Sequence, residues 1–213
     1  IRRQRQMCIR DSLCMGSKAD EPINRRLAMF VPFYMQEYFN KAQIVDKEGQ
    51  TRPLVAKEEK IVITGKTPAD FVSGGITPMQ SASLLLILVA GISIYGIRRG
   101  KTLWGIDLIL FLIAGMAGCI LAFLALFSQH PAVSPNYILF VFHPFHLFCL
   151  PFMLSRVRKR EISRYMLVNF AVLTLFIGLW TIIPQRIPPA VLPLALCLLI
   201  RSASNLILTY KRR

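Results

Sequence analysis

Long apolar runs separated by short polar segments fill the C-terminal two thirds of the chain. Crossing about 30 Å of hydrocarbon takes about 20 helical residues. Backbone polar groups in lipid must bond within their own segment, so runs without strand alternation favour helices. The pattern therefore predicts an all-α integral membrane protein, a bundle of five transmembrane helices within residues 79–213. The expected spans are about 79–97, 104–127, 137–154, 165–183 and 190–210.

Residues 13–78 have a different character, with mixed charge, scattered prolines and no run long enough to span. Residues 28–39 predict a short amphipathic helix. Residues 42–55 predict a hairpin that turns at Glu48 and Gly49, because glycine can take the positive φ of a tight turn. We interpret residues 13–78 as a small α+β remnant, the C-terminal end of an extracytoplasmic domain plus a linker.

The positive charge lies in the apolar part of the chain. Of a net charge of +15, residues 79–213 hold thirteen Lys and Arg against two Asp and Glu. Nucleic-acid binders gather such residues on a soluble face, so we expect no nucleic-acid partner. Short cytoplasmic loops collect Lys and Arg. Eleven of the thirteen fall in the first and third loops and the tail, which predicts a multi-pass membrane protein with residues 13–78 outside and the C-terminus on the cytoplasmic side.

The first twelve residues, IRRQRQMCIRDS, resemble the conceptual translation of a sequencing-library adapter. We exclude residues 1–12 from fold reasoning. The native sequence is then expected to begin near Leu13, as the C-terminal part of a longer protein.

Three histidines are the main candidates for chemistry. His143 and His146 are three residues apart and share a helix face, roughly 9 and 14 Å inward from Tyr137 if the helix is regular. His130 stands at the outer end of the second span. The readings are neutral histidines bonded between helices, which we favour, a proton-handling or headgroup-contacting role, or a metal site with Asp107. Asp107 begins its span at the opposite end, so we predict no metal and no cofactor.

Other polar residues fall inside the spans. Arg201 lies in the fifth span, where we expect it to snorkel toward headgroups; the alternative is an ion pair with a lipid phosphate or an internal partner. Asn136, Asn169 and Asn205 are expected to bridge helices by hydrogen bonds. The four cysteines after residue 12 show no Cys-x-x-Cys spacing, and no histidine or carboxylate pattern marks Cys14 as a nucleophile.

Two segments resemble a known family. LCMGSKADEPINRRLAMFVPFYMQEYF is similar to a Leu-x-x-Gly, Ala-Asp, Phe-x-Pro-x-Tyr pattern, and FSQHPAVSPNYILFVFHPFHL to a Thr-Asp-His-Pro, Asn, Asn-Pro-Leu-His-Leu pattern. Both look like the lipoprotein N-acyltransferase (Lnb) family of Bacteroidota, which joins a papain-like extracytoplasmic domain to five membrane helices. Positions that match the second pattern are His130, Asn136, Pro144 and His146, whereas Gln129 and His143 stand where it has Asp and Asn.

The resemblance implies N-acylation of the N-terminal cysteine of lipoproteins with an acyl chain from a membrane phospholipid. It places the catalytic Cys and His upstream of this chain, so no catalytic residue is carried over. Candidate residues for a lipid contact or the floor of the active site are His130, Asn136, His143, His146 and Arg201. The alternatives are a non-enzymatic membrane anchor or docking module, or a small transporter, for which an inverted repeat would be expected.

Overall fold

The structure is a computed structural model that describes residues 13–20, 32–46, 49–57, 59, 76–129 and 133–211. Residues 1–12 and His130 lie outside this set. The chain divides into two compact units, one formed by residues 1–20 with 76–213 and the other by residues 21–75. The segment 13–20, which the sequence groups with the extracytoplasmic remnant, thus packs with the helical bundle.

The smaller unit contains a helix and a hairpin. Helix α3 (Pro32–Lys41) precedes strands β1 (Gln43–Val45) and β2 (Thr51–Pro53), which pair antiparallel with Ile44 opposite Arg52. Gly49 takes a φ of 82° in the turn, as the hairpin prediction requires. Within the described residues the predicted helix is present as α3, which ends two residues beyond the predicted residue 39; residues 28–31 of the prediction lie outside the described residues.

Three helices of the bundle are long and apolar enough to cross a membrane: α4 (Pro78–Arg99), α5 (Trp104–Phe127) and α9 (Val191–Tyr210). Their bounds lie close to those of the predicted first, second and fifth spans. Thr77 begins α4 with a capping box, in which its side chain and that of Gln80 bond each other's backbone N–H groups. Gly100 ends α4 with a φ of 60°, so the turn into α5 uses a conformation that favours glycine.

The third predicted span, residues 137–154, is broken rather than one regular helix, in keeping with the bend expected at Pro144. A 3₁₀ turn η4 (Tyr137–Phe140) and a short helix α6 (Phe145–Phe148) precede α7 (Leu150–Lys159), and the two halves meet at 77°. Pro144 and Pro151 each lack the N–H that a continuous helix would use, and their rings clash with the preceding turn. The chain therefore breaks where hydropathy alone indicates one helix.

The fourth predicted span is also shorter than expected. Helix α8 (Arg164–Gly178) has 15 residues, and the chain continues in turns to residue 183. At about 1.5 Å per residue, α8 covers roughly 22 Å, less than the thickness of the hydrocarbon.

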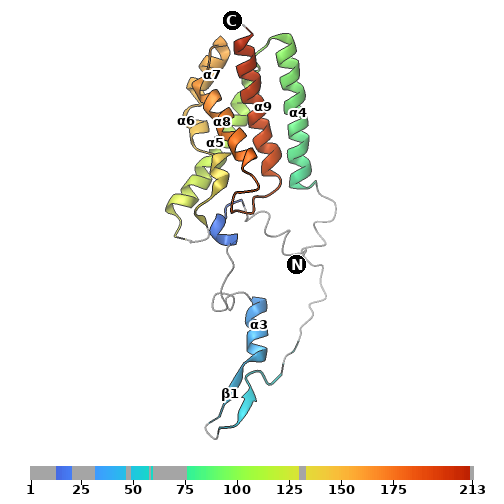
Figure 1. The fold of residues 1–213 in the computed structure, drawn as a ribbon, viewed down its shortest axis with the longest axis vertical. Helices are drawn as coiled ribbons and strands as arrows, with labels where there is room; N and C mark the ends of the chain where they lie inside the picture. Colours follow the sequence, from blue (N-terminus) through green and yellow to red (C-terminus); the bar gives the residue numbers. More distant parts are fainter. Residues whose placement is uncertain are drawn as a thin grey trace. The chain divides into compact units, whose positions relative to one another are not determined.

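Helix α9 lies between α4 and α8, while α6 and α7 pack against α5 (Figure 1). Buried apolar residues from α5, η4, α7, α8 and α9 form one core that includes Phe111, Ile138, Met153 and Leu173. Apolar side chains also face outward along the helices, as Ile87 on α4 and Leu126 on α5 do. Apolar residues on both the inside and the outside are what a bundle in lipid requires.

Candidate functional site

The broken third span lies directly against α5 at two glycines. A Cβ atom added to Gly118 would lie 2.5 Å from the carbonyl carbon of His143, and one added to Gly115 would lie 2.6 Å from the amide nitrogen of Leu147. Glycines three residues apart on α5 thus let irregular backbone approach the helix axis. Non-helical backbone at membrane depth is tolerated where protein covers it, and here α5 covers one side.

This close approach places an aromatic and histidine cluster inside the bundle. The rings of His143 and His146 stack with centroids 3.8 Å apart, and His146 meets Phe111 edge-on at 5.2 Å. His146 Nε2 donates to the Val141 carbonyl at 2.9 Å, while the Tyr165 hydroxyl donates to Nδ1 at 2.6 Å. His146 is fully buried and makes two hydrogen bonds inside the bundle, one of them to Tyr165 of α8. This is the arrangement expected of a histidine bonded between helices.

His143 differs from His146 in its bonding. Its Nδ1 is buried and has no hydrogen-bond partner, although the residue as a whole is only partly buried. The imidazole is therefore held by stacking and by the tight backbone contact with Gly118. Such a nitrogen can still bond a water or a polar ligand group that reaches it.

The contacts with α5 place the histidine pair along that helix. His143 lies against Gly118, which is nine residues, or roughly 14 Å, from the Phe127 end of α5. His146 meets Phe111, while the next residue, Leu147, lies against Gly115 near the middle of α5. Because the two rings stack with centroids 3.8 Å apart, the pair occupies the middle part of α5.

A second arrangement lies at the end of the bundle where α5 finishes, and it joins three segments distant in sequence. Asn136 Nδ2 donates to the Leu13 carbonyl at 3.1 Å, and Ser17 N donates to the Pro135 carbonyl at 2.8 Å. Gln185 Nε2 donates to the Met15 carbonyl at 2.9 Å and lies 3.2 Å from Asn136 Oδ1. We call the contact of residues 13–20 with residues 133–137 and 185–186 the outer interlock.

Two further residues of the motif in segment 13–20 have a defined role in the outer interlock. A Cβ on Gly16 would lie 2.3 Å from the Pro135 carbonyl oxygen and 2.7 Å from that of Val133, so only glycine fits. Asp20 accepts a 2.6 Å hydrogen bond from the backbone N–H of Arg186. The leucine, glycine and aspartate of the motif therefore all contact the bundle, since Leu13 also packs against its core.

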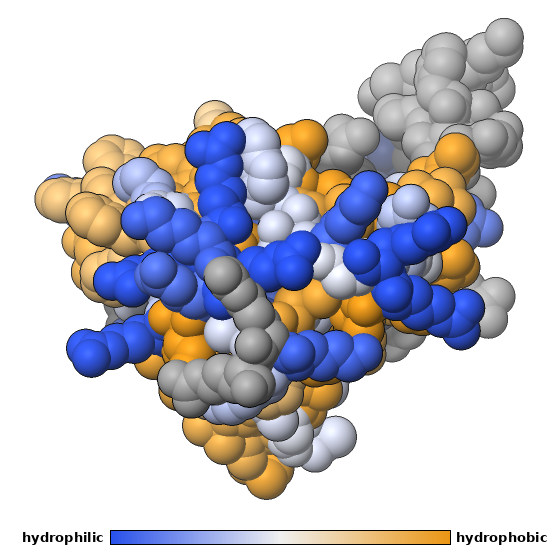
Figure 2. Space-filling model, turned by 90° about the horizontal axis from the view of Figure 1, so that it is seen from above, coloured by the Kyte–Doolittle hydropathy of each residue, from blue (hydrophilic) through white to orange (hydrophobic). Residues whose placement is uncertain are grey.

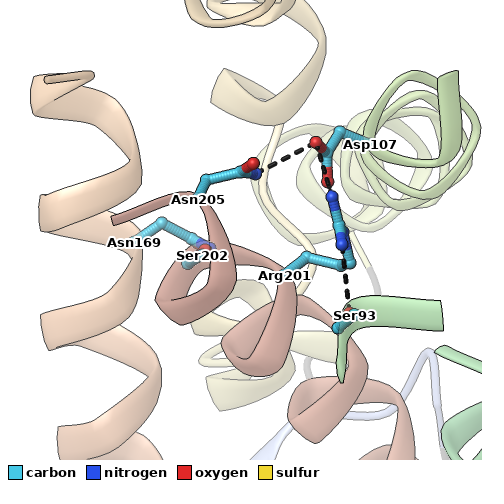
Figure 3. A network of polar contacts seen from close by, with 6 residues as sticks. All are labelled: Ser93, Asp107, Asn169, Arg201, Ser202 and Asn205. Atoms are coloured by element: carbon cyan, nitrogen blue, oxygen red, sulfur yellow. Dashed lines mark hydrogen bonds and ion pairs between the residues drawn. The ribbon is translucent and has the colours of Figure 1, made fainter. Parts of the chain in front are cut away.

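A buried ion pair lies toward the opposite end. Arg201 bonds Asp107 through Nε at 2.6 Å and Nη2 at 3.0 Å, and its Nη1 donates to Ser93 Oγ at 3.0 Å. Figure 3 shows the guanidinium group of α9 between the carboxylate of α5 and the hydroxyl of α4. Arg201 is 1% exposed and Asp107 is 0% exposed. The snorkelling prediction for Arg201 is wrong, because an internal carboxylate meets it in bidentate geometry.

Two asparagines extend this network. Asn205 Nδ2 donates to Asp107 Oδ2 at 3.0 Å, and Asn169 Nδ2 donates to Ser202 Oγ at 2.9 Å. These bonds connect α9 with α5 and with α8, as predicted for Asn169 and Asn205 (Figure 3). Asn136 instead bonds Leu13 and caps η4 through Ile138 N at 3.0 Å.

Basic side chains gather at the end where α4, α7 and α9 finish (Figure 2). Arg160 ends α7 with a φ of 54° and donates to the Gly100 carbonyl, and Arg156 pairs with Glu161. The guanidinium of Arg158 stands 3.9 Å over the ring centroid of Trp104. These contacts give three of the cations a defined partner at this exposed end of the bundle.

Four residues of these contacts were not candidates in the sequence: Gly16, Ser93, Tyr165 and Gln185. A polar residue in an apolar helix was the available signal for Ser93, and the Leu-x-x-Gly pattern marked Gly16 without indicating its partner. Asp107 was considered only as a metal ligand. Within the described residues, no group of three or more His, Cys, Asp or Glu could hold a metal ion.

Comparison with known proteins identifies one family. The family model described as the Lnb transmembrane domain matches residues 70–213, which include the whole bundle from α4 to α9. No curated protein and no solved structure matches the chain. With most of its length covered by that match, the chain belongs to the Lnb transmembrane domain family.

Proposed function

We propose that the bundle is the membrane domain of a lipoprotein N-acyltransferase. In this proposal it holds an extracytoplasmic catalytic domain at the bilayer surface, where an acyl chain passes from a membrane phospholipid to the N-terminal cysteine of a lipoprotein. Membership of the Lnb transmembrane domain family supports the proposal. The outer interlock is the observation that carries it, because it ties a non-membrane segment to one end of the bundle by four hydrogen bonds.

The physical reason for such an attachment is the location of both substrates. A phospholipid and a lipoprotein are each anchored in the same leaflet, so a catalytic group fixed at headgroup height meets them by diffusion in a plane. Holding reactants in one geometry lowers the entropic part of the barrier. A tether with fixed geometry also raises the effective concentration of the catalytic domain at the membrane.

The proposed role of the bundle is positioning, and the site residues divide accordingly. Asn136 belongs to the outer interlock and forms part of the floor beneath the catalytic domain. His143, with its unpartnered Nδ1, is the candidate contact for a polar lipid group. His146 and Arg201 have their bonds satisfied inside the bundle and act as structural residues. The predicted orientation would place the outer interlock on the periplasmic face of the inner membrane.

Gly16→Ala in the complete gene product tests the proposal. The added Cβ would overlap the Pro135 carbonyl, so the outer interlock should loosen and lipoprotein N-acylation should fall at least tenfold. The level of N-acylation is measured by mass spectrometry of N-terminal lipopeptides from cells that depend on this gene for acylation. Gly91→Ala is the matched control, since its Cβ meets nothing within 4 Å.

Three results separate the outcomes. Membrane levels of both variants, measured by immunoblot, should equal those of the unaltered protein. Normal acylation in Gly16→Ala would contradict the role of the outer interlock. If the unaltered complete protein fails to restore acylation, the enzyme assignment falls and a non-enzymatic anchor or docking module becomes the better account.

A further inference from the structure

We propose that the basic end of the bundle binds the phosphate of an anionic phospholipid. A hollow of about 1080 Å³ opens on this face between the end of α7, the following loop and the end of α9. Its lining includes four basic residues, Arg156, Arg158, Lys159 and Arg160, together with Thr209. We call this hollow the basic basin. It lies at the opposite end of α5 from the outer interlock and does not depend on the proposed function.

The local fold explains why the cations converge. Residues 156–160 form the last turn of α7 and its left-handed C-cap, so their side chains spread around one helix end. Arg160 is tied to the carbonyl of Gly100, the residue that caps α4. Loops need only contain Lys and Arg to orient a membrane protein. Convergence on one hollow is a separate property that orientation does not require.

The charge of the lining favours an anion. One carboxylate, Glu161, faces the four cations, and it is paired with Arg156. Each guanidinium carries five N–H donors, so Arg156 and Arg160 retain donors beyond the bonds described. A phosphate accepts such donors in bidentate fashion and is the group that arginine forks fit best.

The surroundings favour a lipid as the source of the phosphate. Arg158 stacks on Trp104, an interfacial residue that is 37% exposed, so the cation lies at headgroup level. One turn back from Arg156 on the same helix, Phe152 is 76% exposed and offers an apolar surface to an acyl chain. Headgroup and chain contacts thus occur along one helix. Figure 2 shows hydrophilic residues gathered on this end of the bundle with hydrophobic residues around them.

Trp104 provides a reporter for the test. The chain has two tryptophans, so Trp180→Phe leaves Trp104 as the single fluorophore. The complete chain in bilayers is titrated with brominated phosphatidylglycerol or brominated phosphatidylcholine, and quenching gives the relative binding constant. We expect roughly a fivefold or larger preference for phosphatidylglycerol. Equal quenching by the two lipids would overturn the proposal.

A matched pair of double variants separates the basic basin from the general charge of this face. Arg158→Gln with Lys159→Gln removes two lining cations and should bring the preference near one. Arg98→Gln with Arg99→Gln removes the same charge from the end of α4, outside the lining, and should change the preference less than twofold. Similar losses in both pairs would show diffuse electrostatics and overturn the proposal.

Two measurements cover the remaining outcomes. Millimolar glycerol phosphate is added in solution as a competitor. If it abolishes the preference for phosphatidylglycerol, the basic basin binds free phosphate and the lipid assignment is wrong. Native mass spectrometry of the unaltered chain applies even where a variant fails to fold. Retention of phosphatidylglycerol over phosphatidylcholine supports the proposal, and equal retention overturns it.

Discussion

Removing one partner of the Arg201–Asp107 pair should destabilise the bundle severely. Arg201→Met removes three hydrogen bonds: two to the carboxylate of Asp107 and one to the hydroxyl of Ser93. Asp107 would then keep only the bond from Asn205 and would remain fully buried with an uncompensated charge. Breaking a buried pair in this way costs about 3–5 kcal/mol of unfolding free energy.

Replacing both partners should cost much less than the two single changes together. In Asp107→Leu with Arg201→Met, no charge is left without its partner, and the new side chains are apolar. Ser93 and Asn205 would still lose one bond each, so we expect a loss below about 3 kcal/mol. The sum of the single variants would be roughly 6–10 kcal/mol. The difference is the coupling between the two residues.

The assay is a double-mutant cycle measured by unfolding in mixed micelles. Circular dichroism follows helix content as sodium dodecyl sulfate is added to the protein in a mild detergent. Arg186→Met is the matched control, because Arg186 lies on an exposed loop and its described hydrogen bond uses only the backbone N–H. We expect a change of less than about 0.5 kcal/mol for this variant.

Additivity would refute the reasoning. If the double variant loses the sum of the single losses within about 0.5 kcal/mol, the two side chains act independently and do not form the pair in the folded bundle. A loss of unfolding free energy below about 1 kcal/mol in Arg201→Met would also contradict the buried pair. Such a small loss is expected of an exposed arginine that snorkels toward the headgroups.

Two further predictions concern the broken third span. Gly118→Leu should destabilise the bundle by at least about 2 kcal/mol in the same assay, since its Cβ alone would overlap the backbone of His143; Gly91→Leu, which meets open space, should change stability little. Tyr165→Phe should lose about 1–3 kcal/mol, because it leaves the buried Nδ1 of His146 without a donor. An unchanged stability in Tyr165→Phe would contradict that hydrogen bond.

The helices that could be predicted were those whose sequence is compatible with a single structure, a helix across the membrane. Predominantly apolar runs of about 20 residues favour a helix that crosses the hydrocarbon, and α4, α5 and α9 follow the predicted bounds closely. The break after Tyr137 could not be located from hydropathy, because a sliding average records composition and not backbone direction. Pro144 and Pro151 indicate a bend, but the two glycines that the bent segment packs against lie on another helix, α5.

The buried ion pair between Arg201 and Asp107 could have been predicted from the sequence, but not by considering each residue with its near neighbours alone. Residues 79–213 hold only two acidic residues, and Asp107 is the one inside a predicted span. A buried charge in a membrane needs an opposite partner, so Arg201 and Asp107 could have been paired by counting alone. Considered separately, Arg201 is instead expected to snorkel and Asp107 is a candidate only as a metal ligand. The outer interlock had no comparable signal, because its bonds go largely to backbone groups.

The outer interlock also shows which parts of the bundle meet at one end. Ser17 bonds Pro135, which follows the end of α5, so segment 13–20 lies at that end of the bundle. Helix α4 precedes α5 and is joined to it by a short turn at Gly100, so Thr77 begins α4 at the same end as Phe127. The hydrogen bonds of segment 13–20 and the capping box of α4 therefore lie at the same end of the bundle, opposite the basic loops.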